Sequence, residues 1–146
     1  MMEPWVICDL DGTLAECGYR ASLIPDWDAF HKMSPMDKPY PAIVRLLELL
    51  NGHHPVLILT GRPEEHRGIT LAWLKAQGVS FDELSMRPTL NYDPDVDCKW
   101  AQAVAFFGSE EAVVANTFLV IDDRDKVVEM WRNKGLTCLQ PRLGDY

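Results

Sequence analysis

The sequence predicts an α/β protein built on a doubly wound, mostly parallel, five-stranded Rossmann-like sheet. Short apolar runs have the character of buried strands. Helical patterns lie between most of these runs, and strands that alternate with helices usually pair in parallel. Acidic or hydroxyl side chains directly follow three of the runs, at the position where open α/β sheets bind ligands.

The expected strands are short apolar runs, and two of the four cysteines fall within them. We expect Cys8 and Cys138 to be buried there as small hydrophobic side chains. The runs are Trp5 to Cys8, Pro55 to Leu59, Leu84 to Met86, Phe118 to Ile121 and Leu136 to Leu139.

Four helical segments are expected between the strands, and a glycine lies just beyond the end of each. A proline opens the second of them, which is a typical first helical position. Three tryptophans on these segments, Trp73, Trp100 and Trp131, suit packing against the sheet better than stacking on bases. The segments are residues 42–50, 63–77, 97–107 and 124–134.

Residues 16–39 do not fit the alternation of strands and helices. The segment contains three prolines with Trp27, Phe30 and Met33 between them, and it is long for a connection between a strand and a helix. In one interpretation it is a small cap or lid insert over the strand end that precedes it. In the other it is a surface excursion packed by its own aromatic rings. The 146 residues otherwise have the size of one domain, so a single domain over 1–146 is expected.

The net charge of -8 argues against stable, non-specific attachment to nucleic acid, because such binding depends on neutralisation of phosphates by Lys and Arg. A local basic site for one phosphate group stays compatible with this charge. No apolar run approaches the roughly 18 residues of a membrane span. The cysteines are scattered without a C-x-x-C pair, which favours a reducing, cytoplasmic setting. The four histidines lack metal-ligand spacing, and the oligomeric state stays open.

Two acidic pairs stand at predicted strand ends. Asp9 and Asp11 follow the first run and precede Gly12, and Asp122 and Asp123 follow the fourth. Carboxylates placed together are costly unless a cation lies between them, and Mg²⁺ prefers such oxygen ligands. The alternatives are an Asx-type turn for the first pair and a helix cap for the second.

A hydroxyl and a glycine follow the second run, at Thr60 and Gly61, directly before a predicted helix. A backbone amide, a small hydroxyl and the positive end of a helix together suit a phosphate group. The alternative is that Thr60 simply caps the helix.

The basic candidates are Lys99 and three arginines. Lys99 opens a predicted helix, where a cation opposes the macrodipole, although a single lysine there is usually solvated. Arg62, Arg87 and Arg124 follow strand ends, so each either contacts a ligand at that edge of the sheet or forms a surface ion pair.

These residues together resemble the motifs of the haloacid dehalogenase-like phosphohydrolases over about residues 5–139. A closer likeness, carried by residues 59–62, 121–132 and 144–146, is to the 3′-phosphatase domain of bacteriophage polynucleotide kinase/phosphatase. The Gly-x-x-x-x-Gly-Lys-Ser/Thr signature of the kinase half is absent. The motifs occur in the family's order: Asp9-x-Asp11-Gly12-Thr13, Thr60, Lys99 and Asp122-Asp123.

The resemblance implies a Mg²⁺-dependent phosphomonoesterase that works through an aspartyl-phosphate. Asp9 would be the nucleophile, and Asp11 would protonate the leaving oxygen and then activate water. The cation would be held by the Asp9 carboxylate, the Asp11 carbonyl and Asp122, with Asp123 helping through water.

The resemblance also assigns the remaining residues. Thr60 and the Gly61 amide would hold phosphate oxygens, and Lys99 would neutralise Asp9 and the transferring group. The implied substrate is a nucleic-acid 3′ end or a nucleotide. The acidic composition and the missing kinase half favour a small nucleotide or a short end over a long duplex.

Three alternatives stay open at this stage. One is a phosphatase of another small phosphorylated metabolite. Another is a signalling receiver, but that would need its phospho-accepting aspartate after the third strand, where the sequence has Met86-Arg87-Pro88. The last is a non-catalytic module that binds a phosphorylated ligand, although every chemical position holds a competent residue.

Overall fold

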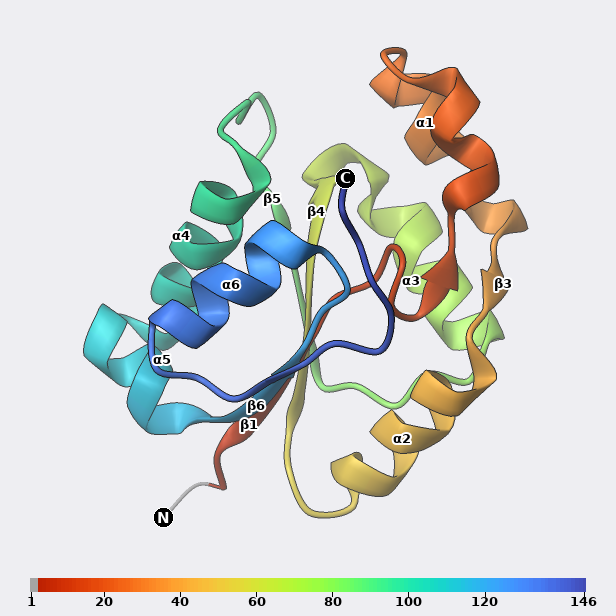
Figure 1. Cartoon of the computed structure of the whole chain (residues 1–146). Helices are drawn as coiled ribbons and strands as arrows, with labels where there is room; N and C mark the ends of the chain where they lie inside the picture. Colours follow the sequence, from red (N-terminus) through yellow and green to blue (C-terminus); the bar gives the residue numbers. More distant parts are fainter. Residues whose placement is uncertain (1–2) are drawn as a thin grey trace.

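The computed structural model describes residues 3–146, and a five-stranded sheet of order β5-β4-β1-β6-β7 lies at its centre (Figure 1). Each neighbouring pair of strands is parallel. The predicted doubly wound α/β fold is therefore confirmed. β4 continues beyond its predicted run, and β7 begins later than expected. The strands are β1 (Trp5–Cys8), β4 (Val56–Pro63), β5 (Glu83–Arg87), β6 (Thr117–Ile121) and β7 (Cys138–Leu139).

Helices cover both faces of the sheet (Figure 1). Four of them match the predicted segments, except that a 3-10 turn, η3 (Glu64–His66), precedes α3. The additional helix α5 is capped at its N-terminus by Ser109, whose hydroxyl accepts a hydrogen bond from the Ala112 amide. Within residues 3–146, no helix is long and apolar enough to cross a membrane. The helices are α2 (Pro41–Asn51), α3 (Arg67–Ala76), α4 (Asp95–Phe107), α5 (Glu110–Asn116) and α6 (Asp125–Asn133).

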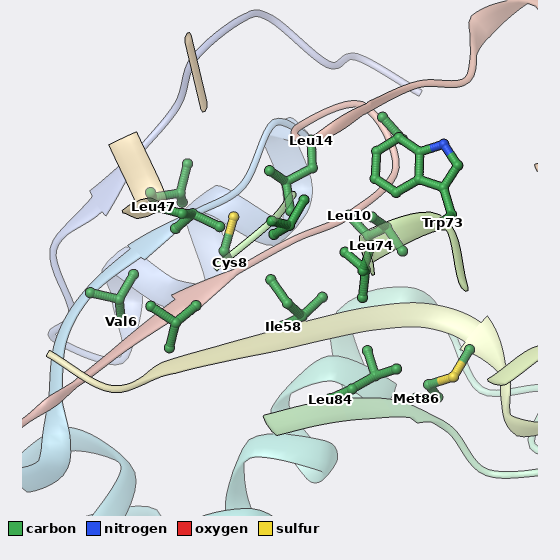
Figure 2. Close-up of a cluster of buried hydrophobic side chains, with 14 residues drawn as sticks. Val6, Cys8, Leu10, Leu14, Leu47, Ile58, Trp73, Leu74, Leu84 and Met86 are labelled. Atoms are coloured by element: carbon green, nitrogen blue, oxygen red, sulfur yellow. The ribbon is translucent and has the colours of Figure 1, made fainter. Parts of the chain in front are cut away.

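Alternate residues of β1 pack into two hydrophobic cores, one on each face of the sheet. Val6 and Cys8 pack with side chains of α2 and α3, including Leu47 and Trp73, as Figure 2 shows. Ile7 packs on the opposite face with side chains of α4, α5 and α6. Because both faces are covered, the strand is apolar throughout and its first polar residues come where it ends.

The aromatic predictions agree with this packing. Trp73 and Trp131 are buried. Trp100 is half-buried and lies edge-on to Trp131, with ring centroids 6.2 Å apart. Cys8 and Cys138 are buried free thiols, as predicted.

The segment over residues 16–39 has its own short elements. Its aromatic rings pack on one another: Trp27 and Phe30 lie edge to face at 5.4 Å, and the Arg20 guanidinium lies 4.3 Å from the Phe30 ring. Two short strands pair in antiparallel fashion at its base. The elements are β2 (Ala15–Glu16), η1 (Gly18–Leu23), α1 (Trp27–Lys32), η2 (Ser34–Met36) and β3 (Lys38–Pro39).

Candidate active site

The predicted site residues come together at the carboxyl edge of the parallel sheet. Asp9 and Asp122 directly follow the adjacent strands β1 and β6, and both remain fixed by sheet-like hydrogen bonds. The Asp9 amide donates to the Ile121 carbonyl at 2.9 Å, and the Asp122 amide donates to the Leu139 carbonyl at 3.2 Å. Their carboxylates are therefore carried on rigid backbone.

Three buried carboxylates form the centre of the site. Oxygens of Asp9, Asp122 and Asp123 all lie within 4.8 Å of one another. Lys99 Nζ, from α4, lies 2.8 Å from Asp9 Oδ1 and 2.9 Å from Asp122 Oδ2. Because Lys99 is only 3% exposed, its interpretation as a solvated side chain is wrong.

Burial controls the protonation of this cluster. It raises the pKa of Asp9 well above the usual range, and the charge of Asp122 adds to the rise while Lys99 opposes it. Burial would lower the pKa of Lys99, but Asp122 and Asp9 outweigh it and raise that pKa. One ammonium thus pairs with two of the three carboxylates of the cluster, in a space that water barely reaches.

The donor set fits a hard divalent cation. Oxygen atoms from Asp9, Asp122 and Asp123 are the ligand type that Mg²⁺ prefers, and their mutual spacing lets one ion contact them together. Such an ion would also supply the positive charge that Lys99 alone does not provide.

The side chain of Thr13, in the turn that follows β1, contacts two of these carboxylates. Thr13 Oγ1 lies 3.0 Å from Asp9 Oδ2 and 3.3 Å from Asp123 Oδ1, so these two carboxylates share its single proton. Gly12 has a φ of +84°, and a Cβ there would collide with the Asp123 carboxylate. This position therefore requires glycine for both conformation and space.

Asp11 points to a different set of partners. Arg62 donates to its two oxygens at 2.7 and 3.0 Å, and Arg20 donates to Oδ1 at 2.8 Å. Burial alone would raise the pKa of Asp11, but the two guanidinium groups outweigh it and hold that pKa far below the usual range. Both arginines also reach buried Asp37, at 2.7 and 3.5 Å.

Thr60 lies inside β4 and caps no helix, so its interpretation as a cap is wrong. Its hydroxyl accepts from the Arg62 amide at 3.2 Å, and its carbonyl accepts from Gln102 Nε2 at 3.1 Å. A Cβ on Gly61 would press on Asp95 Oδ1, so the glycine allows a close approach of α4.

The three candidate substrate arginines are all engaged within the protein. Arg62 is buried on Asp11. Arg87 donates to the Gly61 carbonyl at 3.0 Å and lies 3.3 Å from Asp95. Arg124 lies 3.2 Å from the same Asp95 carboxylate. The Asp95 carboxylate thus pairs with both Arg87 and Arg124, and it also lies 3.8 Å from Lys99 of the site.

Four further residues shape the site without having been predicted. Asp95 stands four positions before Lys99, a helical spacing that could have revealed it. Arg20, Asp37 and Gln102 carry no sequence pattern, because each meets its partner only through tertiary folding.

The chain matches the family described as the polynucleotide kinase PNKP phosphatase domain, over residues 3–146. No curated protein matches it. A chain of the Pnkp1/Rnl/Hen1 RNA repair complex is 28% identical with a TM-score of 0.82, and the match covers 99% of this chain. It covers 44% of that chain, so this protein spans less than half of the similar structure.

More distant structures share the fold. A haloacid dehalogenase-like hydrolase from Streptococcus pneumoniae is 15% identical with a TM-score of 0.67, and the match covers 94% of this chain and 84% of that one. The magnesium-bound HAD-hydrolase YfnB from Bacillus subtilis is 9% identical with a TM-score of 0.63, and the match covers 98% and 94%. At these identities the likeness concerns the architecture.

Proposed function

Because the chain belongs to the polynucleotide kinase PNKP phosphatase domain family, we propose that it is a Mg²⁺-dependent phosphomonoesterase acting on a nucleic-acid 3′ end or a nucleotide. The observation that carries this proposal is the bridge from Lys99 to Asp9 and Asp122, at 2.8 and 2.9 Å, inside a buried carboxylate cluster. A lysine in that place lowers the repulsion between an attacking carboxylate and an anionic phosphate.

The first step is attack by a carboxylate oxygen of Asp9 on phosphorus. The new bond joins Asp9 to the phosphoryl group, and the bond from phosphorus to the leaving oxygen breaks. Thr13 and Lys99 fix the Asp9 oxygens at 3.0 and 2.8 Å, which limits the rotation of the nucleophile. Thr60 and the Gly61 amide hold the phosphate oxygens.

Asp11 serves as the acid and then as the base. It gives a proton to the leaving oxygen, and afterwards takes one from the water that cleaves the aspartyl-phosphate and releases inorganic phosphate. Since Arg62 and Arg20 favour the ionised carboxylate, these contacts must loosen before Asp11 carries a proton.

Asp9, Asp122 and the Asp11 carbonyl would hold Mg²⁺, with Asp123 assisting. The ion supplies positive charge against the phosphate oxygens. The chain's own groups, Lys99 and the Gly61 amide, complement that charge from the side of α4 and β4.

The substrate assignment draws on two further observations. Structural similarity to a chain of an RNA repair complex supports a nucleic-acid end. The net charge of -8 argues against an extended duplex contact. We therefore favour a short or single-stranded end, bound mainly through its terminal phosphate.

Phosphate release tests the proposal. The substrates are an aryl phosphate, a panel of nucleoside monophosphates and a 3′-phosphorylated oligonucleotide, each with Mg²⁺ or EDTA. We expect release with Mg²⁺, its loss in EDTA and its loss in Asp9→Asn. The matched control is Asp97→Asn, an exposed aspartate on the helix that carries Lys99.

Different outcomes reject different parts of the proposal. Folded protein that releases phosphate from none of these substrates is not a phosphatase of this class. Activity that survives Asp9→Asn would remove Asp9 as the nucleophile. Turnover of mononucleotides alone would exclude the polynucleotide substrate, and full activity in EDTA would exclude the cation.

A further inference from the structure

The segment that follows β7, residues 140–146, runs back to the carboxyl ends of the strands (Figure 1). Gln140 Nε2 donates to the main-chain oxygen of Asp123 at 2.9 Å and to Asp125 Oδ1 at 2.6 Å. Gly144 exchanges two hydrogen bonds with Asp125, at 3.1 and 2.7 Å. The segment is therefore attached at both of these points to the chain that directly follows β6.

Close packing around Gly144 restricts the movement of this segment. Gly144 lies against the main-chain oxygen of Asp123, and a Cβ at that position would collide with that oxygen and its carbonyl carbon. Arg142 adds a second contact across the site, because it donates to the Gly12 carbonyl and lies 3.5 Å from the Tyr40 ring centroid.

The segment brings the phenol of Tyr146 to the carboxylate cluster. Tyr146 donates from its hydroxyl to Asp123 Oδ2. Arg124 fixes the same residue from its other side, since Nε donates to the Tyr146 main-chain oxygen at 2.6 Å and the guanidinium lies 5.4 Å from the ring centroid.

Asp123 thereby contacts a neutral hydroxyl at each oxygen: Tyr146 donates to Oδ2, and Thr13, whose proton is shared with Asp9, lies 3.3 Å from Oδ1. Its neighbours in the cluster are held differently, because Lys99 forms ion pairs with Asp9 and Asp122. Within residues 3–146, no ion pair involves Asp123. These two hydroxyls orient the carboxylate and supply no positive charge.

We propose that Tyr146 is a positioning residue of the cation site, where its phenol holds Asp123 toward the divalent ion that Asp9 and Asp122 bind. The inference rests on the proposed function. Partners that orient a ligand typically affect metal affinity by about 10- to 100-fold when they are removed. Tyr146→Phe removes one hydroxyl and keeps the ring, so it isolates this effect.

Direct binding of Mn²⁺, followed by electron paramagnetic resonance of the free ion, tests the inference apart from activity. We expect Tyr146→Phe to raise the Kd for Mn²⁺ by about 10- to 100-fold. Gly144→Ala, which displaces the segment without changing Tyr146, should raise it similarly. Tyr92→Phe is the matched control, since Tyr92 is 86% exposed, and it should bind as the wild type does.

Kinetics give a second readout. In Tyr146→Phe the Mg²⁺ concentration for half-maximal phosphatase activity should rise by the same factor as the Kd, while kcat at saturating Mg²⁺ falls less. A variant that binds Mn²⁺ as tightly as the wild type overturns the role of Tyr146 and leaves the phosphatase proposal intact. If only Gly144→Ala weakens Mn²⁺ binding, the segment affects the site without the Tyr146 hydroxyl, and the role proposed for that hydroxyl is rejected. A wild type without Mn²⁺ binding overturns both proposals.

Discussion

Asp11 and Arg62 are joined by two hydrogen bonds, from Nη2 to Oδ1 at 2.7 Å and from Nε to Oδ2 at 3.0 Å. A guanidinium forms such a fork with a carboxylate because its donors are planar and fixed. The pair keeps Asp11 ionised, whereas its proposed first task is to donate a proton. The contact therefore sets both the orientation and the charge of the proposed acid.

Arg62→Lys tests the geometry of this contact. The charge stays, but a lysine cannot form the fork, so Asp11 should be misplaced. We expect kcat/KM to fall by about 10- to 100-fold, the equivalent of one charged hydrogen bond. Arg45→Lys is the control, because Arg45 pairs with Glu48 on the exposed face of α2 at 3.0 Å. Equal kcat/KM for both variants would show that the fork is not needed.

Asp37→Asn tests the buried network behind the site. Asp37 and its partner Arg20 are both fully buried as side chains and lie 2.7 Å apart. Without the Asp37 charge, the two buried guanidinium groups of Arg20 and Arg62 would face one carboxylate, that of Asp11. We expect the free energy of unfolding to fall by about 3–5 kcal/mol in urea denaturation. The surface pair of Asp28 with Lys32, also at 2.7 Å, is the control, and Asp28→Asn should change the free energy of unfolding far less, because water screens that pair. Similar losses in the two variants would contradict the buried pair's importance.

The sheet and most of the cluster were predictable because their signals are local. A strand buried on both faces has to be apolar, so Asp9 and Asp122 stand out where β1 and β6 end. Parallel pairing then brings both ends to one edge. α5 was missed because its signal is only a capping serine before a short helix.

The buried ion-pair network was not predictable in the same way. Arg20 lies in the irregular segment over residues 16–39, and Asp37 stands near its end, with no periodic pattern linking them to Asp11. The histidines show the same limit, since His31 and His66 are far apart in sequence but their rings lie 5.1 Å apart.

Mg²⁺ should stabilise the folded protein, because a ligand that binds only the native state shifts the folding equilibrium. At a hundred times its Kd the gain is about 2.7 kcal/mol. We expect a higher melting temperature with Mg²⁺ than with EDTA. Asp122→Asn should abolish that difference, and Asp97→Asn, at an exposed position, should retain it. A wild-type melting temperature that is insensitive to saturating Mg²⁺ would contradict the site.

Acid should destabilise the protein partly through His31. Burial lowers the pKa of His31 to about 4, even though Asp11 opposes the shift. His66, Arg62 and Arg20 lower it further. An unfolded histidine has a pKa of about 6.5, so between these values the unfolded state binds more protons than the folded state.

The free energy of unfolding should therefore be constant with respect to His31 above pH 6.5 and decline as the pH falls toward 4, by up to about 3 kcal/mol. His31→Gln should show a smaller decline over this range in urea denaturation at successive pH values. His53→Gln removes an exposed histidine and should keep the wild-type slope. Comparing slopes separates the titration of His31 from any packing cost of the substitution, which shifts the curve at all pH values. Parallel pH curves for the two variants would show that His31 is not the group that makes the fold sensitive to acid.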